Sequence, residues 1–178
     1  YCLRTWAFDL QARKVRPMDI DTMKEIRTYT CIAVSADDST LYCGTTSGDI
    51  ITVSSSRKIK INSGPKKRFD MGVTAIKVIG DELLVGAPDD GVTGIGGGAF
   101  WRLHLDDDGA VTNAVRYAEG LTSAARSFGA ALCVPGDLDG NGILDLAVGA
   151  PSEGSVVDQG SVRILFLDAL GDVIATHR

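Results

Sequence analysis

Part of this chain repeats itself at a spacing of 63 residues, and this repeat limits the fold more than any other feature of the sequence. Residues 83–97 and 146–160 share seven identical residues over fifteen aligned positions. Each copy then runs into an apolar segment, Ala99–Leu105 in the first and Val162–Leu167 in the second. Self-similarity at a fixed spacing is typical of architectures that stack one supersecondary unit. The repeat therefore predicts at least two copies of the same structural unit.

The first half of the chain carries short apolar segments separated by Asp, Ser and Gly. We expect strands at Cys31–Ser35, Thr40–Thr45 and Asp49–Val53, with turns at 36–39 and 47–48 between them. Short strands at close spacing with such turns are the pattern of propeller blades. The predicted fold class is therefore all-β, a partial β-propeller.

Residues 137–145, just before the second apolar copy, alternate oxygen donors with other residues. Side-chain oxygens come at positions 1, 3, 5 and 9 of this loop, and a backbone carbonyl completes the pattern at position 7. Oxygen ligands are those that Ca²⁺ prefers, and a divalent cation relieves the repulsion between neighbouring carboxylates. We therefore expect a Ca²⁺ site, Ca²⁺ being the one cofactor expected. The predicted metal ligands are Asp137, Asp139, Asn141, Ile143 and Asp145.

Two other interpretations of this loop were weighed. A helix-loop-helix calcium site needs a bidentate Glu at its twelfth position, where this chain has Val148. The apolar, β-branched residues after the loop also favour a strand rather than a helix. A hairpin turn rich in Asp, Asn and Gly that binds no metal stays as the alternative, although three acids in strict alternation favour the metal loop.

Residues on both sides of the loop match a known repeat. Phe128-Gly129 precedes the loop and Gly149-Ala150-Pro151 follows it. With these residues, the stretch 83–178 resembles the FG-GAP repeats of integrin α-type propellers, which implies propeller blades and a calcium loop. The upstream copy has the short turn Gly80-Asp81 in place of the loop and no Phe-Gly pair. We therefore expect a single calcium site.

Residues 1–86 carry a different set of motifs. Trp6 takes the aromatic place of a WD-repeat strand, although Ala7 stands where Asp is common. The other matching stretches are Arg13–Pro17, Tyr42–Ile50, Gly64-Pro65 with Phe69, and Gly72–Ile76. With these residues the stretch resembles the cilia- and flagella-associated WD-repeat family, whose members lie inside axonemal doublet microtubules. The resemblance implies a non-catalytic scaffold in the cilium or cytoplasm, with tubulin or axonemal proteins as partners.

Charge divides the chain at the same place as the two resemblances. Residues 1–86 hold thirteen Lys and Arg against ten Asp and Glu, a net charge of +3. Residues 87–178 hold five against thirteen, a net charge of −8. Such asymmetry supports two parts of different origin. We therefore expect WD-repeat-like blades over 1–86, and FG-GAP-like blades with one calcium loop over 87–178.

Six basic side chains gather between the first and second predicted blades. Without interleaved aromatic residues, this cluster is expected to be a solvated loop or a contact for an acidic protein surface, and no nucleic-acid partner is expected. Its members are Arg57, Lys58, Lys60, Lys66, Lys67 and Arg68.

Catalysis is not expected from this sequence. His104 and His177 stand apart from any nucleophile pattern. Three of the four cysteines lie in apparent strand positions, and all four are expected to be small buried side chains: Cys2, Cys31, Cys43 and Cys133. No catalytic residue and no enzyme activity are therefore predicted. The chain also lacks an apolar run of about 20 residues, so no membrane span is expected within it.

Three functional interpretations stay open at this point. The first is an intracellular ciliary scaffold. The second is an extracellular or cell-surface adhesion module that depends on calcium and binds extracellular ligands, as the integrin α-like resemblance implies. The third is a fused or recombined fragment without a unified function, because the two families work in different compartments. Blade number, binding partner and calcium affinity cannot be deduced from the sequence.

Overall fold

The computed structural model describes residues 5–9, 11–18, 28–54, 59–63, 72–88, 90, 97–106, 111–118, 125–153 and 159–178. Every regular element in these residues is a β-strand. The chain begins with a two-stranded antiparallel hairpin, β1 (Thr5–Asp9) and β2 (Lys14–Met18). Three four-stranded antiparallel sheets follow, and we number them blade one to blade three in chain order.

Blade one is the meander that the Asp, Ser and Gly turns predict. Its strands pair in chain order: β3 (Tyr29–Val34), β4 (Thr40–Thr45), β5 (Asp49–Ser54) and β6 (Ile59–Ser63). The turn between β3 and β4 is held by Asp37, whose Oδ1 accepts hydrogen bonds from the hydroxyls of Ser35 and Ser39. These bonds lower the pKa of Asp37 to about 2. Gly48, with φ of 81°, supplies the left-handed residue of the next turn.

Blades two and three repeat the same meander. Blade two consists of β7 (Ala75–Ile79), β8 (Glu82–Ala87), β9 (Ala99–Leu105) and β10 (Val111–Tyr117). Blade three consists of β12 (Ala131–Gly136), β13 (Asp145–Ala150), β15 (Ser161–Leu167) and β16 (Val173–His177). The short strands β11 (Ala125–Arg126) and β14 (Ser152–Glu153) pair with each other beside blade three.

The two copies of the internal repeat take equivalent places in blades two and three. Leu83 on β8 pairs with Leu103 on β9, and Leu146 on β13 pairs with Leu165 on β15. Each copy thus contains most of the second strand of its blade, and the apolar segment after the copy is the third strand. The boundary at residues 86 and 87, where the two resemblances meet, falls inside β8. Both parts of the sequence therefore contribute strands to blade two.

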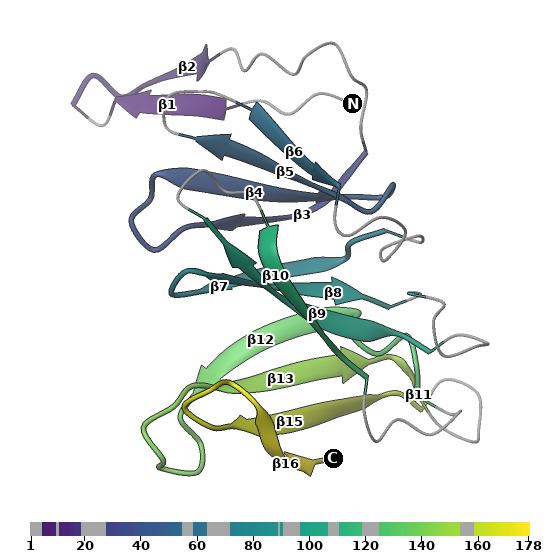
Figure 1. The fold of residues 1–178 in the computed structure, drawn as a ribbon. Helices are drawn as coiled ribbons and strands as arrows, with labels where there is room; N and C mark the ends of the chain where they lie inside the picture. Colours follow the sequence, from purple (N-terminus) through teal and green to yellow (C-terminus); the bar gives the residue numbers. More distant parts are fainter. Residues whose placement is uncertain are drawn as a thin grey trace.

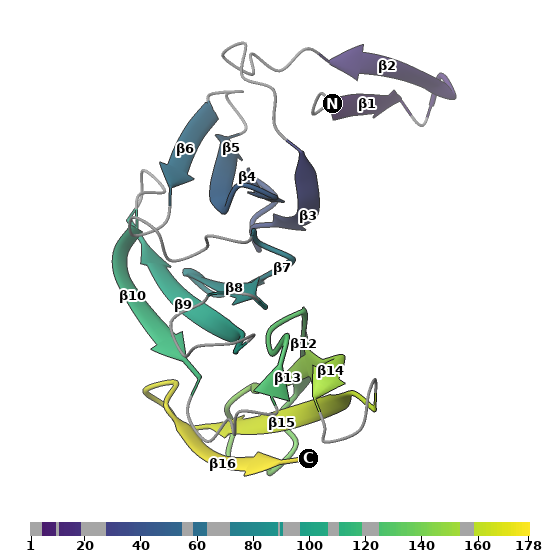
Figure 2. The same cartoon turned by 90° about the vertical axis from the view of Figure 1, so that its right-hand side faces the viewer.

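The three blades stack along an arc (Figures 1 and 2). In Figure 2 the first strands of the blades, β3, β7 and β12, lie along one side of this arc, and the last strands, β6, β10 and β16, lie along the other. β7 contacts both β3 and β12. Consecutive meanders stacked in this way are the architecture of a β-propeller, so the predicted fold class is confirmed. The described blades do not close into a ring.

Two apolar layers hold the blades together. Between blades one and two, Ile50 and Tyr42 pack in one buried cluster with Val85, Trp101 and Leu103. The second cluster joins blades two and three, and its buried members are Leu84, Phe100, Phe128, Leu132, Leu146, Val148, Ala150 and Leu165. Strands alternate their side chains between two faces, so blade two gives one face to each layer. Burial of these two layers is what fixes the order of the blades.

Candidate metal centre

The predicted metal loop joins β12 to β13 at one end of blade three. β12 ends at Gly136, which pairs with Asp145, the first residue of β13. Gly140 and Gly142 have φ values of 80° and 86°. L-residues rarely adopt this left-handed conformation, so these two glycines permit the tight curl between the strands.

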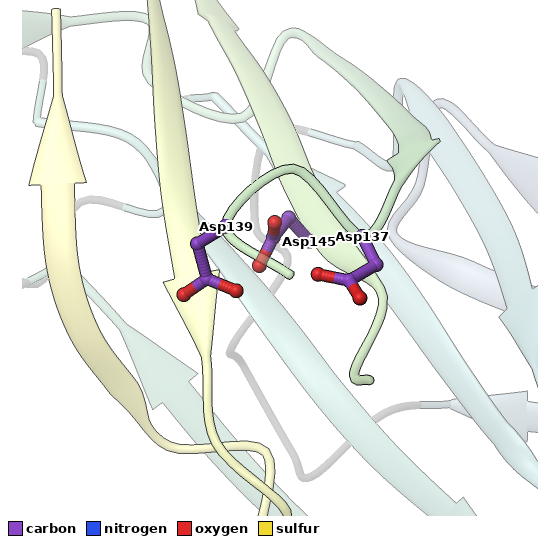
Figure 3. Close-up of side chains that lie close together, drawn as sticks. All are labelled: Asp137, Asp139 and Asp145. Atoms are coloured by element: carbon purple, nitrogen blue, oxygen red, sulfur yellow. The ribbon is translucent and has the colours of Figure 1, made fainter. Parts of the chain in front are cut away.

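Three carboxylates converge inside the loop (Figure 3). Asp137, Asp139 and Asp145 each place a carboxylate oxygen so that all three oxygens lie within 4.8 Å of one another. Asp137 and Asp139 are exposed, whereas Asp145 is fully buried. Among the described residues, none of the three carboxylates has an ion-pair partner. The cluster therefore collects negative charge at one place without a basic side chain to balance it.

Backbone N–H groups donate to all three carboxylates, and Asp139 Oδ1 accepts from Asn141 N at 3.1 Å. Asp137 Oδ2 accepts from Gly142 N at 2.8 Å, and its Oδ1 accepts from Gly140 N at 2.7 Å. These bonds lower the pKa of Asp137, with the Gly142 N–H as the largest cause. Asp145 Oδ2 accepts from Leu138 N at 2.7 Å. The bonds to Asp137 thus favour its ionised form, which is the form that a cation binds.

The other two predicted ligands take part in the loop in a different way. Asn141 Oδ1 accepts from Ile143 N at 2.7 Å, and Asn141 Nδ2 donates to Asp139 Oδ2 at 3.2 Å. Asn141 thus connects to the cluster through its amide nitrogen, and Ile143 is held in the curl by its backbone N–H. The structure brings together the three carboxylates, with Asn141 and Ile143 beside them.

The donor set fits a hard divalent cation. Every side-chain group of the cluster is an oxygen donor, and neither imidazole nor thiolate is among them. Oxygen donors of this kind are those that Ca²⁺ prefers.

One neighbour of the loop was missed by the sequence analysis. The backbone of Leu167, at the end of β15, donates from its N–H to Asp145 Oδ1 at 3.2 Å and accepts from Asn141 Nδ2 at 2.8 Å. Leu167 lies 22 residues beyond Asp145 and is an ordinary apolar strand residue. No spacing rule connects it to the loop, because only the pairing of β13 with β15 brings the two together.

The turn after Leu167 anchors blade three to blade two. Arg102 Nη1 donates to the carbonyl oxygen of Leu170 at 2.7 Å, and the Tyr117 hydroxyl donates to the carbonyl oxygen of Gly171 at 3.1 Å. Arg102 is itself held by Glu82, and this contact raises the pKa of the guanidinium. The turn thus lies between the calcium loop on one side and blade two on the other.

A groove of about 590 Å³ opens between blades two and three. Phe100, Tyr117, Leu165 and Val173 form much of its wall, and Arg116 and Arg163 also line it. Each arginine is paired with a buried acid: Arg116 with Asp90 and Arg163 with Glu153. These pairs support the structure of the blades.

The histidines and cysteines, for which no catalytic role is predicted, lie apart from the metal loop. His104 Nδ1 lies 3.1 Å from Glu82 Oε1, and His177 is exposed on β16. Cys31 and Cys43 are at least partly buried, and burial raises the pKa of Cys43 to about 11. Cys133 is exposed, so the expectation that it is buried was wrong. It lies on the first strand of blade three, whose outer face no other sheet covers.

Several predicted features lie outside the described residues. Cys2 and the segment 64–70 are among them, and so are Arg57 and Lys58 of the basic cluster. Lys60 is on β6. Among the residues that the structure describes, none forms a helix long and apolar enough to cross a lipid bilayer.

Comparison with known proteins finds a family match and a set of relatives. The FG-GAP repeat family matches residues 128–165, which include the metal loop. Over 87 residues the chain is 39% identical to cilia- and flagella-associated protein 52 of Sus scrofa, and over 91 residues it is 37% identical to the protein of that name in Chlamydomonas reinhardtii. These matches cover 48% and 49% of this chain but 14% of each relative. The chain thus spans about one seventh of the length of these relatives.

Solved structures support the fold. A chain in the crystal structure of the mitotic checkpoint complex aligns with 98% of this chain at a TM-score of 0.55 and 14% identity, over 45% of its own length. The Dos1 propeller aligns with 96% of this chain at the same TM-score and identity, over 53% of its own length. At this identity the likeness concerns the fold alone. The chain is a β-propeller segment that is similar to cilia- and flagella-associated protein 52 over about half of its length and to the FG-GAP repeat at residues 128–165.

Proposed function

We propose that this chain is a non-enzymatic scaffold segment of the cilium, which binds tubulin or axonemal proteins through its blades. The observation that carries the proposal is its identity of 37–39% to cilia- and flagella-associated proteins of a green alga and of mammals. A fold whose described elements are all strands in stacked sheets also supports a binding role.

Co-sedimentation with axonemal doublet microtubules tests this function. The chain should pellet with doublets at low salt, and Lys60→Glu should weaken binding severalfold if the basic cluster faces the acidic lattice. Lys77→Glu is the matched control, because Lys77 is exposed on β7 and lies outside the cluster. A chain that stays in the supernatant with doublets and with tubulin contradicts the scaffold function.

We also propose that Ca²⁺ binds to the loop of blade three. Asp137, Asp139 and Asp145 would supply carboxylates, and Asn141 and Ile143 would supply an amide oxygen and a backbone carbonyl. Bound there, the ion would supply positive charge that holds β12 and β13 together at their connecting loop. Isothermal titration with Ca²⁺ and, separately, with Mg²⁺ measures this binding. The larger, flexible oxygen shell favours Ca²⁺.

The FG-GAP match also gives a reason to test the extracellular alternative. A calcium-dependent adhesion module would be secreted or displayed at the cell surface. A tagged full-length product in ciliated cells should instead stay with the axoneme after membranes are removed with detergent. Recovery of the tagged product in the medium would favour the adhesion module and contradict the ciliary scaffold.

A further inference from the structure

The groove between blades two and three lies between two strand edges. β10 is the last strand of blade two and β16 the last strand of blade three, and each pairs with only one of the described strands. Both lie on the same side of the arc (Figure 2). Residues 115–118 and 172–176 of these two segments line the groove. Because an edge strand leaves backbone N–H and C=O groups unpaired along its free side, the groove offers backbone partners to another extended chain.

The wall of the groove is largely apolar. On the side of blade two, the rings of Phe100 and Tyr117 stack with their centroids 4.8 Å apart. Leu165 and Val173 line the groove from blade three. Ile174 also lines it and is 58% exposed, although its side chain is large and apolar. These side chains favour a ligand that brings an apolar side chain of its own.

Arg163 adds N–H donors to one end of the groove. It stands two residues before Leu165 on β15, so the two side chains leave the same face of the strand. Its Nε and Nη2 donate to the carboxylate of Glu153, which is 2% exposed and is not part of the described lining. Nη1 has no hydrogen-bond partner among the described residues. Because each guanidinium nitrogen is a donor, Arg163 keeps N–H groups from which the carboxylate of a ligand can accept.

The other charged residues of the groove are placed differently. Tyr117 packs toward blade three, so the neighbouring Arg116 points to the opposite face of β10, where a buried acid binds it. Asp172 precedes β16, and its neighbour Val173 pairs with the last residue of β15, at the end away from Arg163. The described lining thus has a basic end at Arg163 and an acidic end at Asp172. Charge complementarity favours a ligand whose acidic group lies at the Arg163 end.

The direction of a bound chain follows from the pairing of the last two strands. β15 and β16 are antiparallel, so a chain that pairs antiparallel with the free side of β16 runs in the direction of β15. Along that direction Arg163 comes before Leu165. Alternate residues of a strand lie about 6.6 Å apart on one face. An acidic residue and an apolar residue two positions later therefore reach Arg163 and the apolar wall together.

We propose that this groove binds an extended peptide of a partner protein, in which an acidic residue stands two positions before a large apolar one. The peptide pairs antiparallel with β16, its carboxylate accepts from Arg163 Nη1, and its apolar side chain packs against Tyr117 and Leu165. Backbone pairing supplies affinity in this mode of recognition, and the alternate side chains supply specificity. The site does not depend on binding to doublet microtubules through the basic cluster, whose described member Lys60 lies on blade one.

Fluorescence anisotropy with three labelled heptapeptides tests the proposal. The probe Ser-Thr-Glu-Thr-Leu-Thr-Ser should bind the wild-type chain saturably. Its analogue Ser-Thr-Gln-Thr-Leu-Thr-Ser should bind about tenfold more weakly, because a hydrogen bond between charged groups is lost. The isomer Ser-Thr-Thr-Glu-Leu-Thr-Ser has the same composition, but its Glu and Leu face opposite sides of a strand, so it should also bind about tenfold more weakly.

Ile174→Asp should weaken binding of the probe about tenfold, since it replaces an apolar side chain of the groove with a carboxylate that repels the Glu of the peptide. Val162→Asp is the matched control. Val162 is also 58% exposed and its substitution changes the charge equally, but it lies outside the described lining of the groove. Because both positions are exposed, both variants should keep the fold, which circular dichroism checks.

Weaker binding of both altered peptides, with a loss in Ile174→Asp and none in Val162→Asp, supports the proposal. It is overturned if the probe does not bind saturably, if all three peptides bind with equal affinity, or if the two variants lose affinity equally. Co-sedimentation with doublets measures the ciliary function separately, so failure of one proposal is distinguished from failure of the other.

Discussion

Asp139 is the carboxylate of the loop whose removal is expected to cost the fold least. It is exposed, and its contacts are to Asn141 within the loop. A ligand that binds only the folded state adds RT ln(1 + [L]/Kd) to stability, about 2.7 kcal/mol at a hundredfold excess over Kd. For a chain of this length that is a rise in Tm of about 5–10 °C. We expect calorimetry to show this rise with Ca²⁺ in the wild type and none in Asp139→Ala.

Asp81→Ala is the control for that experiment. Asp81 is exposed in the β7–β8 turn, at the place in blade two that corresponds to the metal loop, and its removal changes the net charge by the same amount. This variant should keep the full response to Ca²⁺. A wild-type Tm that is the same with Ca²⁺ and with chelator would refute the calcium site itself.

Glu153 gives stability that depends on pH. Its carboxylate is buried and bound by Arg163 and Ser161, and these contacts lower its pKa, with Arg163 as the largest cause. A lowered folded-state pKa stabilises the fold above the unfolded pKa of about 4.3, and this contribution is lost as the pH falls below it. Glu153→Gln should lower stability by about 1.5–3 kcal/mol at pH 7 and flatten its acid dependence.

Urea unfolding at pH 7 and at pH 3 measures both effects. Asp81→Asn serves as the comparison, because it removes an exposed carboxylate that has no described partner. If the stability difference between wild type and Glu153→Gln were as large at pH 3 as at pH 7, the ion pair would not be its source.

Whether a residue of the candidate site could be predicted depends on how far it lies from the others in the sequence. The acids at 137, 139 and 145 were found from their alternation, because a tight loop brings neighbours in sequence together in space. Leu167 was not found, since its contacts with Asp145 and Asn141 depend on the pairing of β13 with β15. Local chemistry can be predicted from local sequence, whereas a backbone group from another strand cannot.

At the scale of elements, the turn after β15 joins two blades. Gly171 has φ of 75°, and a Cβ built on it would lie 1.8 Å from Arg102 Nη1. Gly171→Ala should therefore displace the guanidinium from the Leu170 carbonyl as well as strain the backbone. Gly80→Ala should strain the backbone in the same way, because Gly80 has φ of 58°. A Cβ on Gly80 would meet nothing within 4 Å, however.

We expect Gly171→Ala to cost about 1.5–3 kcal/mol more than Gly80→Ala, since a hydrogen bond from a charged donor is lost only in the first. Denaturant unfolding of both variants measures the difference. If both variants lost the same free energy of unfolding, the Arg102 contact would not stabilise the packing of blade three on blade two.

The strands themselves were largely predictable. Strands were expected at Thr40–Thr45 and Asp49–Val53, and the structure has β4 over Thr40–Thr45 and β5 over Asp49–Ser54. Alternating or β-branched runs between Asp, Ser and Gly turns specify such strands through local geometry. The side of the sheet that each residue faces also follows from alternation. Which neighbouring blade covers that side does not.

For the whole molecule, the effect of calcium should be limited in range. In stacked arrays each unit contacts only its neighbours, so stabilisation of one unit reaches the next and then fades. Hydrogen exchange with and without Ca²⁺ should show added protection in blade three, weaker protection in blade two at the Arg102 and Tyr117 contacts, and little in blade one. Equal protection over all three blades would indicate one cooperative unit instead.

The sequence by itself determined the strands, the turns and the convergence of three acids, because each of these depends on residues that are close along the chain. It also determined that a repeated unit had to stack on its copies, since one amphipathic sheet cannot bury both of its faces alone. The tertiary structure decided which faces are covered. Phe100 and Val162 take equivalent places in their blades, yet one is buried and the other exposed, because only the first has another sheet against it. Burial depends on neighbours in space, and those are fixed only when the blades are assembled.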